Sequence, residues 1–532
     1  MTLAGGILAG AQTASAAAPV STDVAITANG HGSATPRFID QRTNPQAPEI
    51  AGQEAPAPLG IDGKPTGSSL PTGTSKGSKP AGSAGTTGAG GANSATTPRP
   101  NIPAPTTVNA NFDGINQAAG GGAQPSDINA SVGPTQILET VNRRVTVFNK
   151  VGGQLCTNTL AGFLGLGALN VFDPRTLYDN LNNRFIIVVS TPGVAGQAPR
   201  LFLAASTTGN ACGGYFVYGL SFNGGLYPLG ALLDYPMLGQ DRQAILVSTN
   251  NFNPGYINTA AWSVSKALVY AGAAVNFPAF GVAFSTEPTT VTGIPLGATA
   301  NTFWVAGVPG TGYNLYRMTN SAGPGTTLVL QATIASAYAA PPRRVNQCPV
   351  AGATTLDPLD GRIVWAPVQA AGSTFVWLTH GNNIAGFPGV QYGAINTANN
   401  TVQVANVFHS GTSDDFNPSL AAFEVAPNSL NIFVQWAYTD PGASPCRNTS
   451  TTVNGVAPGG GIPALIATDL TLAIGTVTTN NTRFGDYSSA HIDPVAASAT
   501  CPAGSTALVA QQYFDAAGWK TRLARVSFGP GC

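Results

Sequence analysis

Charged side chains are scarce in this sequence. Asp, Glu, Lys and Arg make up 9% of its 532 residues, and 23 basic and 23 acidic residues cancel to a net charge of zero. A typical soluble domain carries about 25% charged residues. The lysines and arginines are scattered, with no run long enough to neutralise a phosphate backbone. Nucleic acid is therefore excluded as an expected partner.

Signals of membrane insertion and of zinc chemistry are also missing. No uncharged apolar run of about 18 or more residues is present beyond the start of the chain, so no transmembrane segment is expected. The four histidines form no His-Glu-x-x-His motif, and no two cysteines form a Cys-x-x-Cys pair. These absences argue against a zinc peptidase, a zinc ribbon and a thioredoxin-like redox site.

The first 107 residues lack the composition of a folded domain. Residues 1–18 are small and apolar and contain Ala14-Ser-Ala16, as at the end of a secretory signal, but the basic start of such a signal is missing. A start assigned too late would explain this truncated leader. Residues 19–107 are rich in Gly, Ser, Thr and Pro and nearly free of aromatics, so we expect a disordered spacer there. The folded domain then covers residues 108–532.

All six cysteines lie in the expected folded domain. An even number of widely spaced cysteines fits disulfides formed in an oxidising compartment, and buried free thiols are the alternative. Six cysteines allow 15 pairings. We favour pairing between neighbours in sequence: Cys156–Cys212, Cys348–Cys446 and Cys501–Cys532. With the leader, this predicts a secreted, extracellular protein, either released or associated with the cell surface, and we expect it to be a monomer.

Short runs of β-branched and aromatic residues recur after residue 108. They have the length of strands and are bounded by Gly, Asn, Asp and Pro, whereas no long stretch has a clean helical period. The clearest runs are residues 137–148, 184–190, 244–249, 302–306, 362–368, 430–438 and 507–514. An all-β fold follows.

A weak repeat precedes these runs. Each copy has a polar residue, usually Asp, then a turn or Pro, then a residue that opens a strand. The copies are residues 126–133, 172–179, 233–239, 293–297, 356–360, 415–421 and 485–490. Their spacing of roughly 45 to 70 residues is typical of propeller blades. We therefore predict a β-propeller with seven blades, leaving six or eight blades open; a large β-sandwich or two β-domains is the alternative.

The recurrent aspartates have two interpretations. They can accept N–H groups in turns between blades. Alternatively, they open the innermost strands and form a ring of carboxylates at the channel mouth, which would bind a cation or a polar ligand. The members of this ring would be Asp127, Asp234, Asp415 and Asp486. No cofactor is required, but loop oxygens at Asp127 and Asn129, or at residues 413–415, are candidate Ca²⁺ ligands.

The last repeat holds the best local group of candidate ligand-binding residues: Arg483, Asp486, Tyr487 and His491. In the functional interpretation, all four lie at the channel mouth and bind a polar ligand such as a sugar. In the structural interpretation, Arg483 and Asp486 form an ion pair within a turn. Exposed tryptophans that stack on sugar rings are a further hypothesis, with Trp262, Trp377 and Trp519 as candidates.

Five blocks together resemble a family of secreted bacterial propeller proteins with a sialidase-like fold. The blocks are residues 127–134 with 140–149, 173–185, 234–252, 356–362 and 483–494, and they follow the order and approximate spacing of that family. Phe185 and Phe484 stand where the family pattern has Trp. Because most of the family has no assigned activity, the resemblance implies a fold more than a function.

Catalysis is not marked by any motif. Glycosidases normally use two carboxylates, and sialidases use a Tyr nucleophile. The expected folded domain holds three glutamates, Glu139, Glu287 and Glu424, and no Ser-x-Asp-x-Gly-x-Thr-Trp box. The leading hypothesis is a secreted propeller that binds a glycan or another polar surface ligand at the channel mouth. The alternatives are a glycoside hydrolase or lyase of the same fold, and a structural or adhesion protein of the cell surface.

Overall fold

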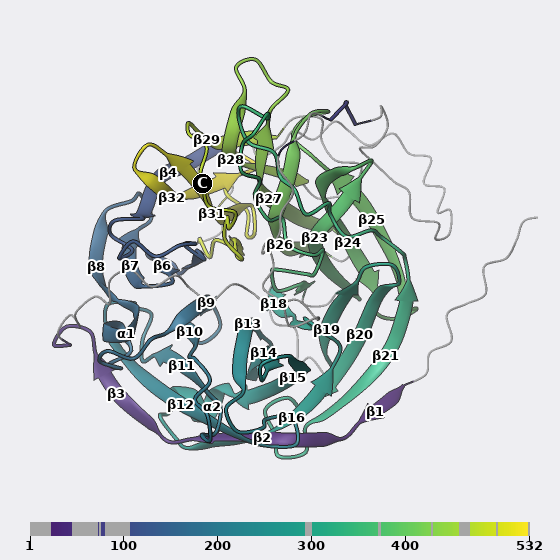
Figure 1. Ribbon diagram of the computed structural model, residues 1–532. Helices are drawn as coiled ribbons and strands as arrows, with labels where there is room; N and C mark the ends of the chain where they lie inside the picture. Colours follow the sequence, from purple (N-terminus) through teal and green to yellow (C-terminus); the bar gives the residue numbers. More distant parts are fainter. Residues whose placement is uncertain are drawn as a thin grey trace, which may run out of the picture.

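A computed structural model describes residues 23–44, 73, 76–79, 107–292, 301–370, 374–426, 429–456, 469–495, 498, 500–529 and 532. Within these ranges the chain is almost entirely β-structure, arranged as a ring around one axis (Figure 1). The expected leader lies outside the described residues. Two short helices are present in the described part, α1 (Leu160–Phe163) and α2 (Lys266–Tyr270).

The ring consists of seven antiparallel, four-stranded blades. The first three blades are β5 (Asn129–Val132), β6 (Gln136–Val141), β7 (Arg144–Asn149) and β8 (Gln154–Thr159); β9 (Phe172–Asp179), β10 (Arg184–Ser190), β11 (Arg200–Ser206) and β12 (Gly214–Gly224); and β13 (Leu232–Gln240), β14 (Ala244–Phe252), β15 (Tyr256–Ser265) and β16 (Val275–Val282). The fourth blade is β17 (Glu287–Pro288), β19 (Thr302–Val308), β20 (Gly312–Thr319) and β21 (Thr327–Ala335).

The last three blades follow the same plan. They are β22 (Val368–Ala370), β23 (Phe375–Ile384), β24 (Phe387–Asn396) and β25 (Thr401–Val407); β26 (Asp414–Ala426), β27 (Ser429–Asp440), β28 (Arg447–Val456) and β29 (Leu470–Gly475); and β30 (Ser489–Ile492), β31 (Thr506–Asp515), β32 (Gly518–Ser527) and β4 (Thr107–Asn116). A short strand, β18 (Thr290–Thr292), pairs in parallel with β13 and β22.

The two ends of the folded domain meet in the seventh blade. Strand β4, from the start of the domain, pairs with β32, near its end. Because this pairing joins distant parts of the sequence, it closes the ring. A separate buried apolar cluster lies at each interface between neighbouring blades, including the interface between the seventh and first blades. The structure therefore confirms the predicted all-β propeller with seven blades.

The tryptophans belong to these clusters. Trp262, Trp377 and Trp519 are at most 2% exposed, and each packs with apolar neighbours from its own and the adjoining blade. The hypothesis that these rings stack on sugars is therefore wrong, because a ring buried between blades has no free face for a ligand.

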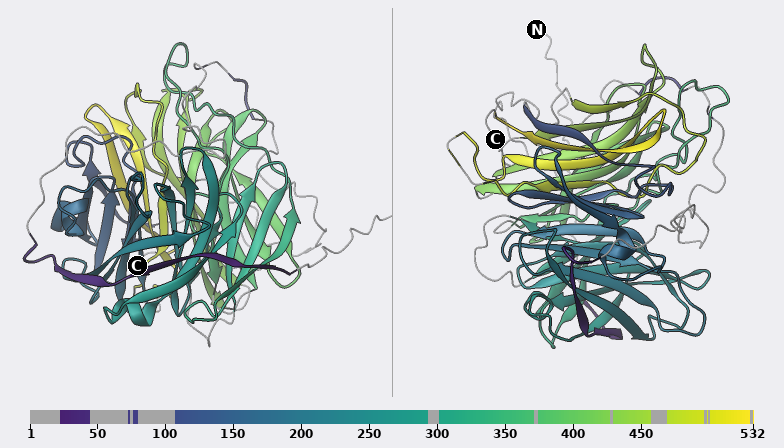
Figure 2. Two further views of the ribbon diagram at one scale, coloured as in Figure 1. Left: turned by 60° about the horizontal axis from the view of Figure 1, so that its bottom comes forward. Right: turned by 90° about the vertical axis from the view of Figure 1, so that its left-hand side faces the viewer.

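Part of the expected spacer is ordered. Strand β1 (Val24–Ile26) pairs with β21, β2 (Ala28–Ala34) pairs with both β12 and β16, and β3 (Pro36–Asp40) pairs with β12. These strands form a strap along the outer edge of blades two to four, drawn in purple in Figures 1 and 2. The expectation of disorder is wrong for this stretch.

Main-chain hydrogen bonds explain how such a polar stretch becomes ordered. The strap covers open strand edges and needs little apolar burial of its own. Its glycines allow a close approach, because a Cβ atom on Gly32 would lie 2.6 Å from the ring of Phe277, and one on Gly30 would lie 2.9 Å from the ring of Tyr227. Composition alone does not show this pairing.

Three disulfides join the six cysteines in the favoured pairing, Cys156–Cys212, Cys348–Cys446 and Cys501–Cys532. The alternative of buried free thiols is wrong, since the described residues contain no free cysteine. Disulfides form and persist in oxidising compartments. The second disulfide fastens the long connection between the fourth and fifth blades to the sixth blade.

Candidate functional site at the propeller axis

One backbone feature recurs at the axis of every blade. Within the innermost strand, or in the connection that leads into it, one residue has a positive φ between 49° and 149°, a conformation that most side chains avoid. These turn residues are Asp127, Asp173, Tyr235, Ser285, Leu359, Asn417 and Gly485. In β9, β13 and β26 the turn coincides with an irregularity in the strand register, as expected of a β-bulge.

The predicted repeat therefore corresponds to real turns, although the copy in the fourth blade is misplaced and that in the sixth blade is aligned two residues too early. The fourth copy, residues 293–297, lies outside the described residues. The described turn of the fourth blade is at Ser285, just before Glu287 opens β17. This turn has no Asp, which explains why the pattern did not find it.

Three carboxylates converge at the axis from the first, second and seventh blades. An oxygen of each of Asp127, Asp173 and Asp486 lies within 4.8 Å of the others. Asp127 accepts the backbone N–H of Asp486 at 2.7 Å and the Asn142 amide at 2.5 Å. Asp173 accepts the Tyr487 hydroxyl at 2.9 Å. These side chains accept hydrogen bonds from turn groups, as the structural interpretation expects. They also gather at one point, as the ligand-binding interpretation expects.

Burial controls the charge of this group. It raises the pKa of Asp127, and it raises those of Asp173 and Asp486 well above their usual range, with neighbouring carboxylates adding to the effect. Arg483 opposes the shift through its ion pair with Asp486, at 2.9 Å. The three carboxyl groups therefore hold their protons more tightly than isolated carboxyl groups do, and they titrate as a coupled set. The three carboxylates are also the described residues best placed to hold a cation such as Ca²⁺.

A second layer of charged and aromatic side chains lies beside the carboxylates. The Arg175 guanidinium lies 4.4 Å from the Tyr487 ring and 5.4 Å from the Trp365 ring. The Arg362 guanidinium lies 5.0 Å from the Tyr235 ring, and Tyr235 packs on Tyr487 with 4.8 Å between ring centroids. Such cation–π contacts hold desolvated guanidinium groups in place.

Glu287 is the unusual member of this layer. It is fully buried, and neither of its carboxylate oxygens has a hydrogen-bond partner among the described residues. Burial raises its pKa to about 8, while the charges of Arg175 and Arg362 act in the opposite direction. An unpaired buried carboxylate is costly when charged, so Glu287 is protonated at neutral pH.

His491 and Trp365 lie edge to face, with 4.9 Å between ring centroids. Both line a cavity of about 20 Å³, which has room for about one water molecule. Burial and the Arg175 charge lower the pKa of His491 to about 3, so the ring is neutral. Its Nε2 has no hydrogen-bond partner among the described residues.

The structure brings most of the predicted site together. Asp127, Arg483, Asp486 and Tyr487 are in direct or shared contact, and Asp234 is close enough for its charge to raise the pKa of Asp173. His491 joins them through Arg175 and Trp365. Of the seven predicted ligand-binding residues, Asp415 does not lie in this group.

Asp415 is not part of the axial group. Its carboxylate accepts the Trp436 indole N–H of the sixth blade at 2.8 Å and pairs at 3.1 Å with Lys79 of the expected spacer. The residue that the sixth blade contributes at the axis is Asn417, which donates to the carbonyls of Gly485 and Tyr487. The repeat was aligned two residues too early in this blade.

Sequence reasoning missed Arg175, Arg362 and Trp365, and it mentioned Glu287 only as one of three glutamates. A signal was available: Arg175, Glu287 and Tyr487 each lie two residues after the turn residue of their blade. Because side chains alternate along a strand, this position faces the same way in each innermost strand. The residue types differ between blades, so the shared position becomes visible only once the turns are aligned.

One edge of the axial group reaches the surface. The Arg343 side chain is 47% exposed and pairs at 3.5 Å with Asp357, which is 5% exposed. Asp357 donates its backbone N–H to Thr482, and its charge raises the pKa of Asp486. The pairs Arg343–Asp357 and Arg483–Asp486 therefore lead from the surface to the axial group. We call these two pairs the rim, and the surface at Arg343 the mouth.

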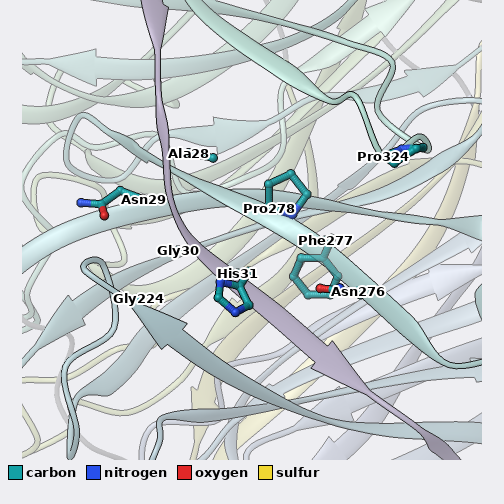
Figure 3. Close-up of a pocket in the computed structure, with 9 residues that line it drawn as sticks. All are labelled: Ala28, Asn29, Gly30, His31, Gly224, Asn276, Phe277, Pro278 and Pro324. Atoms are coloured by element: carbon teal, nitrogen blue, oxygen red, sulfur yellow. The ribbon is translucent and has the colours of Figure 1, made fainter.

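A larger hollow lies elsewhere, on the outer edge. It has a volume of about 590 Å³ and lies beside the strap, where β2 meets β16. Figure 3 shows His31 beside Phe277, with Asn276 and Pro278 next to them. His31 is the one titratable side chain among the described residues that line it, so this hollow has no group of reactive residues comparable to the axis.

The fold and the axial group define the chain as a disulfide-stabilised, seven-bladed β-propeller. No helix in the described part of the chain is long and apolar enough to cross a membrane. No protein-family model matches the sequence. No curated protein matches it either.

Solved structures show distant similarity to other propellers. A subtype N10 neuraminidase-like protein of A/little yellow-shouldered bat/Guatemala/060/2010 has 10% identity and a TM-score of 0.33, covering 66% of this chain and 99% of its own. An exo-β-1,3-galactanase from Phanerochaete chrysosporium has 10% identity and a TM-score of 0.28, covering 76% and 95%. The phage phi92 endosialidase has 8% identity and a TM-score of 0.34, covering 76% and 67%. These similarities are distant, and no sequence family is assigned.

Proposed function

We propose that this chain is a secreted, extracellular propeller that binds a glycan or a similar polar ligand at the mouth. The observation that carries the proposal is the rim formed by the ion pairs Arg343–Asp357 and Arg483–Asp486. Guanidinium and carboxylate groups in a fixed array can bind sugar hydroxyls and sugar carboxylates through charge-assisted hydrogen bonds. The buried layer beneath holds these groups in place.

The burial of the side chains at the axis favours a binding function over catalysis. Arg175, Glu287 and Tyr487 are at most 1% exposed, and the cavity next to this layer has room for about one water molecule. A ligand at the mouth would therefore contact the rim without reaching Arg175 or Glu287. This supports a non-catalytic binding protein.

Replacing Arg343 by Ala tests this proposal. Because Arg343 is half-exposed and its ion pair is long, its loss should leave the fold intact and weaken ligand binding by about tenfold or more, as for a charged hydrogen bond. The measurement is binding of the full chain to a glycan array, followed by titration of the best ligand.

Arg522→Ala is the matched control, because Arg522 pairs with Asp113 at 3.1 Å on the outer edge of the seventh blade. Arg483→Ala and Asp486→Asn should weaken binding further. Equal binding by the wild type and the Arg343→Ala variant would refute a site at the mouth. Absence of binding to any glycan would instead favour a structural or adhesion role.

A glycoside hydrolase is the second candidate, supported by one observation. Glu287 keeps its proton at neutral pH and lies near Arg175 and Arg362, as a general acid in a polar site would. This function requires the axial layer to open for substrate. Turnover of sialosides or polysaccharides that is lost in Glu287→Gln and retained in Glu424→Gln would establish it.

A further inference from the structure

Asp415 forms the base of a second polar site, in the sixth blade. Its carboxylate accepts the Trp436 indole N–H and the His409 backbone N–H at 2.8 Å each, and the Ser413 hydroxyl at 2.6 Å. These three donors come from the propeller itself. They hold the carboxylate in one orientation whether or not a cation is present.

The site is complementary to an ammonium group. The Lys79 Nζ lies 3.1 Å from Asp415 and from the Ser410 carbonyl, and 3.2 Å from the Ser413 hydroxyl. It also lies 4.9 Å from the centre of the Phe387 ring and 4.7 Å from that of Phe408. A carboxylate, a carbonyl and two aromatic faces are the groups that recognise a desolvated ammonium. We call Phe387, Phe408, Ser410, Ser413 and Asp415 the lysine pocket.

A second lysine extends the contact. The Lys76 Nζ lies 2.7 Å from Asp414 and 5.1 Å from the centre of the Phe387 ring. The two lysines therefore pair with two adjacent carboxylates and share one aromatic ring. Residues 413–415 were candidate Ca²⁺ ligands. In the structure, lysine ammonium groups pair with both aspartates of this stretch.

Both lysines come from the expected spacer. The main-chain hydrogen bonds of this segment to the propeller are from Lys79 to Gly411 at 2.7 Å and from Gly73 to Ala353 at 3.4 Å, among the described residues. Recognition therefore depends mainly on the lysine side chains. Residues 80–106, which connect the segment to β4, can span at most roughly 90 Å, so the segment has the reach to contact a neighbouring molecule.

We infer that the lysine pocket is a recognition site for an extended peptide with two lysines three residues apart. The chain fills the pocket in cis with Lys76 and Lys79, and a second copy of the chain supplies the same segment when the cis lysines are absent. This site is distinct from the mouth and does not depend on the proposed function.

The first test uses the full chain with Lys76→Gln and Lys79→Met, which leaves the pocket vacant. A capped peptide of residues 73–80, Gly-Thr-Ser-Lys-Gly-Ser-Lys-Pro, is titrated into it by calorimetry. We expect saturable binding that weakens at least 30-fold when norleucine replaces the second lysine of the peptide. Binding to the wild-type chain should be at least tenfold weaker, because the cis lysines compete.

Lys520→Met is the matched control, since Lys520 forms a surface pair with Asp515 at 2.6 Å and should leave the chain like the wild type. Equal affinity for the lysine and norleucine peptides would refute recognition of a lysine ammonium group by the pocket. Equal affinity for the vacant and wild-type chains would also overturn it, because the peptide would then bind elsewhere.

The second test measures exchange between copies by sedimentation. The vacant-pocket variant is mixed with a full chain carrying Asp415→Asn, or Phe408→Leu if the first does not fold. Each variant alone should be a monomer, and the mixture should form a dimer, because one copy offers the lysines and the other the pocket. Peptide binding without a dimer in the mixture would overturn exchange with a second copy.

Discussion

Replacing both Cys348 and Cys446 by Ser is expected to lower the free energy of unfolding by about 5 kcal/mol. The two residues are 98 positions apart, and closing a loop of that length removes conformational entropy mainly from the unfolded chain. Changing both cysteines together avoids a free thiol. The measurement is urea unfolding of the oxidised full chain, followed by intrinsic fluorescence.

The Cys501–Cys532 disulfide provides the comparison. Its cysteines are 31 positions apart, so the same argument gives a loss of about 4 kcal/mol for the double Ser variant. The order of the two losses is the informative result. A larger loss at Cys501–Cys532 would show that native contacts around the disulfide, and not loop length, determine its contribution.

Loss of Cys348–Cys446 should also affect the mouth. Cys348 lies in the connection that carries Arg343 and Asp357, and its backbone N–H donates to Asn448 of the sixth blade at 2.9 Å. The disulfide and this hydrogen bond keep the connection on the ring. Stability and the position of the polar rim are thus coupled through one covalent link.

The sequence predicted the architecture because the propeller repeats a local pattern. Each blade needs a turn at the axis together with an innermost strand, and an Asp stabilises such a turn in several blades. The pattern failed where another residue type serves the turn. Ser285 does so in the fourth blade and Asn417 in the sixth, so the glutamate at the axis was not placed and Asp415 was placed wrongly.

The spacer could not be predicted because composition describes the burial a segment can achieve by itself. Strand β2 gains its order from open edges on β12 and β16, and Lys79 from a pocket built by distant residues. Both are tertiary interactions of a polar segment with a finished propeller. The hydrophobicity of a segment does not predict such interactions.

Stability above pH 6.5 should depend on Glu287. Burial raises its pKa to about 8, and burial raises the pKa of Glu139, at the seam between the first and seventh blades, to about 7. Because the folded state binds these protons more tightly, the stabilisation is complete below the unfolded pKa of about 4.5 and is lost as pH rises through the folded values.

Two buried histidines oppose this loss at lower pH. Burial lowers the pKa of His380 to about 4 and that of His491 to about 3. The unfolded chain therefore binds more protons at these residues up to about pH 6.5, and stability gained there as pH rises offsets the loss from the glutamates. Above that pH the histidine effect ends while Glu287 still titrates.

Between pH 6.5 and 8 the expected curve therefore falls, because the buried glutamates still titrate there and the histidines no longer offset them. The Glu287 share of that fall is about 2 kcal/mol, from 1.36 kcal/mol per unit of pKa. Glu287→Gln, which keeps the shape and stays neutral, should remove this share, whereas Glu424→Gln at a half-buried position should retain it. Urea unfolding at intervals from pH 5.5 to 8.5 measures each curve. Parallel curves for the wild type and Glu287→Gln would mean that the carboxyl group ionises at the same pH folded and unfolded, and that Glu287 does not occupy a sealed site at the axis.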